Sequence, residues 1–231
     1  MIENKMFCFQ CQETAKGTGC TIKGVCGKEA ETSKWQDLLI SVVRGIGTIQ
    51  HALGGKPSKE VADYIVDSLF ATITNANFDD QSILNKVDAG LSLKKKLIEE
   101  ASNKNISLPD YQEVRWGGEK SDYSEEGIRE GVLRNENPDL RSLKELTILG
   151  LKGMSAYYDH ASRLDETNDE IIAFMCKALS EISNPNADMD TLISLVLETG
   201  KYGVDAMALL DKANTSAYGN PEITKVNIGD R

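Results

Sequence analysis

Four of the five cysteines lie close together near the start of the sequence, at Cys8, Cys11, Cys20 and Cys26. Their spacing is C-x2-C-x8-C-x5-C, which places four thiols within 19 residues. An x2 pair can direct two sulfur atoms to one side of a tight turn, and four thiolates are enough ligands for a complete iron–sulfur cluster. The spacing therefore predicts that these four residues hold a metal centre.

Zinc and disulfide bonds are the competing interpretations of the same cysteines. A structural zinc site usually has two short x2 to x4 pairs, and the x5 interval before Cys26 fits that pattern less well. The nearby glycines let the chain curl closely enough for backbone N–H groups to point at sulfur; they are Gly17, Gly19, Gly24 and Gly27. Spacing alone favours an iron–sulfur cluster over zinc, and zinc over disulfides, and leaves all three open.

The overall composition is acidic and typical of a packed globular protein. The 231 residues include 36 acids and 26 bases, a formal net charge of −10. This charge disfavours nucleic acid and anionic membranes as partners and suits a redox partner with a basic face. We find no apolar run long enough to span a membrane and no apolar leader after Met1, so we expect a cytoplasmic protein. In a reducing cytoplasm, clustered cysteines more often bind metal than form disulfides.

Apolar periodicity predicts an all-α fold, with a cysteine-rich cluster loop followed by two three-helix bundles. Helices are expected from Ser33, with a capping box to Gln36, to the stop at Gly54, and then over 58–75, 80–103, 139–164, 167–184 and from 188 onward. A short helix near 123–133 and a kink or a break near Gly200 and Gly203 are also expected. The predicted division is 1–31 cluster loop, 32–106 first bundle, 107–137 connection, 138–220 second bundle and 221–231 start of a further α/β domain.

Two apolar stripes in the second half of the chain are predicted to face the core, because they recur at helical spacing. They comprise Leu140, Leu143, Leu146, Leu149, Met154 and Tyr157 in one helix, and Leu192, Leu195, Val196, Val204, Met207 and Leu210 in the last. The Lys94–Lys96 run, by contrast, is interpreted as a solvated helix face.

Other residues with chemical potential receive structural interpretations. Cys176, within an amphipathic helix, is predicted to be a buried, inert thiol. His51 and His160, each near a helix end, are predicted to be surface or capping residues without a ligand role. Trp35 is predicted to lie in the core at the foot of the cysteine loop, with shielding of the cluster from water as the alternative.

The amino-terminal segment closely resembles that of hybrid cluster proteins, also called prismane proteins or hydroxylamine reductases. The resemblance rests on Met6–Thr14, Gly19-Cys20, Gly24–Lys28, Gln36–Leu39, Thr72–Phe78, Gly200–Gly203 and Tyr218–Pro221. Essentially the whole chain is covered. The resemblance implies an all-helical domain of two three-helix bundles, in which Cys8, Cys11, Cys20 and Cys26 hold a [4Fe-4S] cluster that passes electrons to a second, hybrid iron–sulfur–oxygen cluster.

The resemblance also implies what this chain lacks. The family holds its hybrid cluster with a histidine, glutamates and several further cysteines in later domains, whereas this sequence has only Cys176 and two histidines beyond the loop. We therefore expect the electron-transfer domain of a longer enzyme that reduces hydroxylamine to ammonia, or nitric oxide to nitrous oxide. Its partners would be a redox donor protein and the enzyme's remaining domains. The alternative is a freestanding ferredoxin-like carrier or a metal-stapled helical binding module.

Overall fold

The computed structural model describes residues 6–229, and in this range it is built of helices joined by loops. The helices are α1 Ala30–Leu53, α2 Lys59–Ala71, α3 Asp80–Asn103, α4 Gln112–Arg115, α5 Tyr123–Arg129, α6 Pro138–Ser162, α7 Asp169–Ser183 and α8 Met189–Tyr218, with 3-10 turns at Ala15–Gly17, Lys120–Asp122 and Val132–Arg134. The all-α prediction is confirmed. None of the described helices is long and apolar enough to span a membrane.

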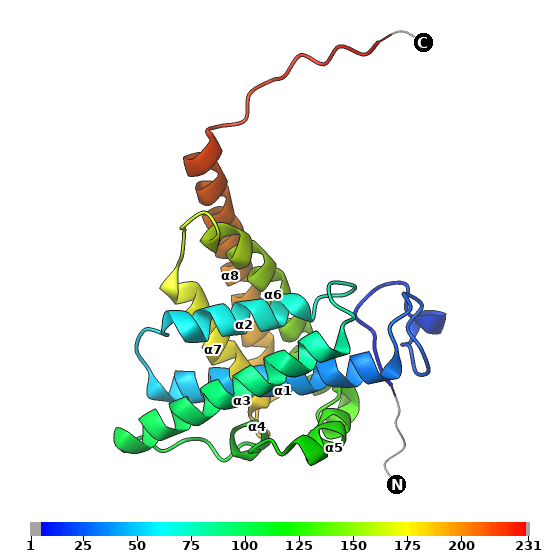
Figure 1. Cartoon of the computed structure of the whole chain (residues 1–231), viewed down its shortest axis with the longest axis vertical. Coiled ribbons are helices and arrows are strands. Elements are labelled where there is room, and N and C mark those ends of the chain that lie inside the picture. The colour runs from blue at the N-terminus through cyan, green and yellow to red at the C-terminus, as the bar shows by residue number, and fades with distance from the viewer. Residues whose placement is uncertain (1–5, 230–231) are drawn as a thin grey trace.

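Helix α1 is the element around which the others are arranged. It packs against α3 on one side and α7 on another, and it also contacts α2, α4 and α5. Two glycines permit the closest of these contacts. A Cβ on Gly45 would lie 2.3 Å from the carbonyl oxygen of Glu113, and one on Gly47 would lie 2.7 Å from Leu179. Figure 1 shows α1, α2 and α3 running across the molecule, while α6 and α8 run along its length.

The helix starts follow local capping, with two corrections to the sequence prediction. Ser58 caps α2 by accepting from Val61 N at 3.3 Å, and α3 begins at the predicted residue behind Asp79. Helix α1, however, begins three residues before Ser33, whose side chain is buried instead of capping. Helix α7, predicted from residue 167, begins at Asp169 behind Asn168, whose side chain caps it by accepting from Glu170 N. The short helix near 123–133 is present as α5.

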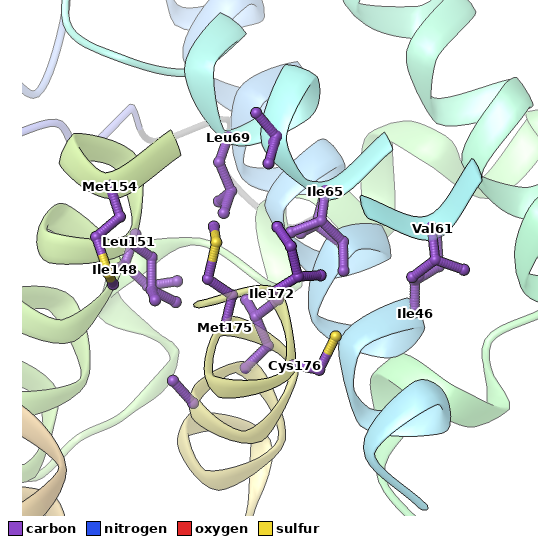
Figure 2. Close-up of a cluster of buried hydrophobic side chains, with 14 of the residues drawn as sticks. Ile46, Val61, Ile65, Leu69, Ile148, Leu151, Met154, Ile172, Met175 and Cys176 are labelled. Atoms are coloured by element: carbon purple, nitrogen blue, oxygen red, sulfur yellow. The ribbon is translucent and has the colours of Figure 1, made fainter. Parts of the chain in front are cut away.

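One continuous hydrophobic core joins both halves of the chain. Figure 2 shows side chains of α1, α2, α6 and α7 meeting in it, including Ile46, Ile65, Leu151 and Met175. Because α1 contacts α7 as closely as it contacts α3, the helices of the two predicted bundles share this core. The predicted division into a loop, two bundles and a connection stays a prediction, and its residues 1–5 and 230–231 lie outside the described part.

The two predicted apolar stripes on α6 and α8 are only partly buried. Leu192, Leu195 and Met154 lie in the core as predicted. Other members of the stripes are exposed: Leu146, Leu149, Tyr157, Val204 and Met207. The reason is that α6 turns a different face inward, with Leu151 and the ammonium-bearing Lys152 on its buried side. Helix α8 is continuous through Gly200 and Gly203, so the predicted break is absent from it.

The Lys94–Lys96 run is solvated at Lys95 and Lys96 but not at Lys94, which corrects the prediction for that residue. Lys94 is buried, and its Nζ donates to the carbonyl oxygens of Glu113 at 2.9 Å and Trp116 at 2.5 Å. Successive residues of a helix point in different directions around its axis, so Lys94 can face the core while Lys95 and Lys96 face solvent. Lys94 therefore holds α4 and the segment that follows it against α3.

A buried ion network fixes α4 and the segment after α5 onto α1. Arg44 pairs with Glu113 and lies 3.5 Å from Glu130, and Arg134 Nη1 lies 2.9 Å from Glu113 and 2.5 Å from Glu130. Arg44 also donates to Ser183 Oγ in α7 at 3.2 Å. Within a low-dielectric interior, removing one partner leaves the opposite charge without compensation.

We predict that Arg44→Met destabilises the chain by about 3–5 kcal/mol, because Glu113 and Glu130 lose a buried cation. Urea unfolding followed by circular dichroism measures this change. The matched control is Lys59→Met, whose pair with Asp63 is exposed, and its effect should stay within about 0.5 kcal/mol. Equal small losses in both variants would contradict the importance of the network.

Candidate functional site

The loop before α1 carries all four predicted ligands and is closed by a short backbone pairing. Cys8 N donates to Cys20 O at 3.0 Å, and Cys20 N donates to Cys8 O at 2.8 Å. This antiparallel bridge places the first and third cysteines opposite each other. The loop lies at one side of the molecule, next to the start of α1 (Figure 1).

Gly19 makes the return of the chain to Cys20 possible. Its φ is +139°, and a Cβ built on it would lie 2.8 Å from the ring of Phe7. Only glycine adopts this backbone conformation readily, and only glycine leaves room for the ring. The last cysteine lies on a separate turn, closed by Gly24 N donating to Lys28 O at 2.8 Å and Gly27 N donating to Gly24 O at 2.8 Å.

The four thiols differ in exposure and in their hydrogen bonds. Cys20 is buried, Cys8 and Cys11 are partly buried, and Cys26 is exposed. Ala15 N points at Cys20 Sγ at 3.5 Å, and the backbone N–H of Gln10 bonds to the sulfur of Cys8. Burial raises the pKa of the Cys8 thiol, while the Gln10 N–H and the Lys28 ammonium oppose that rise. These N–H···S contacts are of the kind that tune metal-bound thiolates.

The predicted ligands are brought together in part. All four thiols are free of disulfides, and Cys8 and Cys20 are paired through their backbones. Over residues 6–229, however, no three His, Cys, Asp or Glu side chains form a group able to hold a metal ion. In its chemistry the donor set fits an iron–sulfur centre, since it offers four thiols and backbone N–H groups directed at two of them.

The turn between Cys8 and Cys11 is tied to the helices by its middle residue. Gln10 Oε1 accepts from Lys152 Nζ of α6 at 3.2 Å, and Gln10 O accepts from Thr74 Oγ1, just after α2, at 3.3 Å. Lys152 Nζ also donates to Thr72 O at 2.9 Å. A single buried ammonium thus joins the cysteine turn to the carboxyl end of α2.

A second buried lysine supports the other end of the loop. Lys28 Nζ donates to Gln36 Oε1 at 2.7 Å, and Gln36 Nε2 donates to Asn77 O at 3.0 Å. This explains why Gln36 does not serve as a capping residue. Neither Lys28 nor Lys152 has a role that the sequence alone predicts. Lys152 lies on the face of α6 that is buried in the structure. The sequence prediction turned a different face of this helix inward, so Lys152 was not recognised as a buried lysine.

Two acidic side chains lie behind the cysteine turn. Asp37 of α1 and Glu145 of α6 line a cavity of about 20 Å³ together with Cys8, Gln10 and Lys152. Burial raises the pKa of Asp37 to about 8, and the neighbouring Glu145 adds to this rise. Burial also raises the pKa of Glu145 and lowers that of Lys152 to about 8. The region behind the loop therefore favours neutral carboxyl groups.

The remaining candidates lie away from the loop or in the packing around it. Cys176 is buried in the core (Figure 2), and burial raises its pKa to about 12, as expected for an inert thiol. His51 is exposed in the last turn of α1, and the exposed His160 ring lies edge-on to Phe70. Trp35 is partly buried against the core; its shielding of a cluster stays a prediction.

These features define an all-α domain with an amino-terminal loop that carries four free cysteines. The model of the Prismane/CO dehydrogenase family matches residues 6–231. The chain belongs to this family. Membership implies iron–sulfur cofactors in general terms.

Curated relatives extend the comparison to named proteins. The chain is 52% identical over 228 residues to a hydroxylamine reductase of Bacteroides fragilis strain YCH46, covering 98% of this chain and 41% of that protein. It is 49% identical over 231 residues to one of Desulfitobacterium hafniense strain DCB-2, covering 98% and 42%. It is 46% identical over 254 residues to one of Clostridium botulinum strain 657, covering 98% and 45%. The chain thus spans about two fifths of the length of these relatives.

We predict that Asp37→Asn reduces the pH dependence of stability in the metal-free chain. The folded state raises the pKa of Asp37 from 3.8 to about 8, so the contribution of Asp37 to stability is fully present below about pH 4 and is lost as pH rises through 8. The slope of the free energy of unfolding approaches about 1.4 kcal/mol per pH unit for one proton. It should fall short of this limit because Asp37 is only partly enclosed.

Urea unfolding at intervals between pH 5 and 8 tests this prediction. The Asp37→Asn chain should lose less stability across the range than the wild type. Asp190→Asn, at an exposed position in the first turn of α8, serves as the control. Parallel stability curves for wild type and Asp37→Asn would show that the buried carboxyl is not the source of the slope.

Proposed function

We propose that this chain is the electron-transfer domain of a hydroxylamine reductase-type oxidoreductase and that Cys8, Cys11, Cys20 and Cys26 hold a [4Fe-4S] cluster. The observation that carries the proposal is the Cys8–Cys20 backbone pairing, with N–H groups directed at the sulfur of both residues. A structural zinc site usually has two short x2 to x4 cysteine pairs, and the x5 interval before Cys26 fits that pattern less well.

When bound, such a cluster accepts and donates one electron at a time. Four thiolates of this chain would bind it, and one of them, Cys20, is buried away from water. The backbone N–H groups of Gln10 and Ala15 are directed at the sulfur atoms of Cys8 and Cys20. N–H···S contacts and burial are the main means by which a protein sets the potential of such a centre. The helices keep the loop in place while an electron enters and leaves.

The reaction itself would take place elsewhere in a longer enzyme. Reducing hydroxylamine consumes two electrons and two protons and yields ammonia and water; reducing two molecules of nitric oxide consumes the same and yields nitrous oxide and water. The family's hybrid cluster would carry out this step. With one cysteine and two histidines outside the loop, this chain does not provide the ligand set for that second cluster. Cys176, the remaining cysteine, is locked in the core.

The partners we propose are the remaining domains of the longer enzyme and a redox donor protein with a basic surface. The net charge of −10 favours such a donor and disfavours nucleic acid and anionic membranes. The free thiols suit the reducing cytoplasm, where we place the protein.

An apolar groove between α6 and α8 is the surface we assign to the remaining domains. It has a volume of about 410 Å³ and is lined by apolar residues and glycines, among them Leu146, Gly150, Gly200, Val204 and Met207. The helical patterns of both elements predict a buried face here, yet Val204 is 61% exposed. Relatives more than twice as long as this chain supply the polypeptide to cover it. A second copy is disfavoured because two chains of charge −10 repel each other. A freestanding carrier would have no use for this face.

We predict that the chain, purified without oxygen and reconstituted with iron and sulfide, holds about four of each per molecule, with a broad visible absorption that dithionite bleaches. Cys20→Ser should lose most of this iron because Cys20 is the buried ligand of the loop. Cys176→Ser is the matched control and should keep wild-type iron content. Stoichiometric zinc without visible absorption, or full cluster content in Cys20→Ser, would overturn the proposed ligand set.

We further predict that the chain co-purifies with the part of the Bacteroides fragilis relative that it does not match, when the two are expressed together. Leu146→Lys combined with Val204→Lys should lower recovery roughly tenfold or more, since both charges enter the apolar groove. The control is Ile98→Lys, at an exposed apolar residue of α3. Recovery that is insensitive to the groove variants but lost in the control would place the interface elsewhere.

A further inference from the structure

Lys152 is a buried cation whose direct partners are neutral. Its side chain lies within the interior, with the residue only 3% exposed, and its Nζ donates to Gln10 Oε1 at 3.2 Å and Thr72 O at 2.9 Å. The first acceptor is a side-chain amide oxygen and the second a backbone carbonyl. Burying an ammonium group without an anion is unfavourable, so a buried lysine of this kind calls for a negative charge nearby.

Burial disfavours the negative charge of the two carboxyl groups that face Lys152. Asp37 from α1 and Glu145 from the preceding turns of α6 face it, and burial raises the pKa of both. Asp37, with a pKa of about 8, is mostly protonated at pH 7. The third neighbour, Lys28, is itself a buried cation bonded to the neutral amide of Gln36. Two positive charges thus face the cysteine loop from inside the protein.

We infer that Lys152 is a positioning residue for the cysteine loop, which anchors the Cys8–Cys11 turn through Gln10 and whose charge raises the reduction potential of the cluster held there. The inference rests on the proposed function. The inference gives Lys152 two roles within that function: a mechanical role at the Gln10 side chain and an electrostatic role at the loop as a whole. Substitutions can separate the two roles.

The electrostatic role follows from charge counting. Four thiolates on a dicationic core carry a net charge of about −2, and one electron from an external reductant makes it about −3, with no bond or proton changed. A fixed positive charge stabilises the −3 state more than the −2 state. In the buried surroundings of Lys152 this difference is large, whereas exposed lysines of the loop such as Lys16 and Lys23 are screened by water and salt.

The mechanical role follows from the position of Gln10. It lies between the first two ligands, and both its side chain and its carbonyl are held by the helical body, the side chain by Lys152 and the carbonyl by Thr74. A turn fixed in this way presents Cys8 and Cys11 to the metal without losing conformational freedom on binding. Loss of the side-chain contact should therefore speed release of iron.

The test uses the full chain reconstituted anaerobically, with wild type, Lys152→Met, Lys152→Gln and Gln10→Met compared. A dithionite titration at pH 7 with redox mediators, followed by absorption and electron paramagnetic resonance, gives the potential. At a given potential the ratio of reduced to oxidised cluster should fall roughly tenfold in Lys152→Met, a shift of about 59 mV for one electron. Lys152→Gln keeps hydrogen-bond donors but removes the charge, so its reduction potential should shift by the same amount. It takes the place of Lys152→Met in the comparison if Lys152→Met fails to fold.

Gln10→Met separates the two roles, because it removes the contact but keeps the charge. It should release iron to a chelator several times faster than wild type while its potential moves less than that of the Lys152 variants. Lys144→Met is the matched control. Lys144 belongs to the same helix, is also buried, and has its pKa lowered to about 8. Its Nζ, however, donates to Asn184 O and not to the cysteine loop.

The outcomes distinguish this inference from the proposed function. A wild-type chain that takes up no iron and sulfide refutes the proposed function and, with it, the inference. A wild-type cluster whose potential is the same in Lys152→Gln as in Lys144→Met refutes the electrostatic role alone. Wild-type release of iron from Gln10→Met refutes the anchoring role. A lower potential in the Lys152 variants, with Lys144→Met unchanged, supports the inference.

Discussion

The burial of α1 on nearly all sides is the constraint on which the structure depends. An ordinary surface helix hides one stripe, whereas α1 is enclosed by α3, α7, α2 and the short elements after α3. Its polar residues are therefore carried inside along with its apolar ones. Arg44 requires the carboxylates of Glu113 and Glu130, and Gln36 requires Lys28 and Asn77. The chain segments that supply these partners are held against α1 as a result, including the end of the cysteine loop.

The same constraint couples the loop to distant parts of the sequence. Lys152 reaches Gln10 across 142 residues, and Thr74 reaches it across 64. Neither contact involves a cysteine. The thiols are local in sequence, but the groups that hold their turn come from α6 and from the segment after α2, so the integrity of the core and the geometry of the loop are linked. This arrangement suits the proposed electron-transfer role, in which the centre changes charge without moving.

Local signals predicted the parts of the fold that local physics determines. The start of α3 behind Asp79 and of α2 behind Ser58 follow from capping, and Gly54, with φ of +68°, ends α1 as predicted. The spacing of four cysteines identified the loop. Failures occurred where tertiary contacts override the pattern. Ser33 and Gln36 have the form of a capping box but are used inside the core, and Lys94 is turned inward within a charged run.

The phase of α6 could not be read from the sequence because it has two faces suited to burial. One is the apolar stripe through Leu146 and Tyr157, and the other carries Leu151 with two lysines and several small polar residues. Sequence periodicity selected the first, and the structure uses the second. For the same reason Lys152 was overlooked: a lysine indicates solvent unless its partners are known, and those partners are a glutamine side chain and a carbonyl far away in sequence.

The closeness of α1 to its neighbours also limits how this protein can vary. A side chain at Gly45 would collide with a backbone carbonyl oxygen at 2.3 Å, an atom that cannot swing aside as a flexible side chain would. At Gly47 the obstacle is Leu179, whose own atoms are locked in the core. These two positions, two residues apart and on different sides of α1, are therefore closed to every larger residue, and random libraries of the gene should leave them untouched among the clones that still fold.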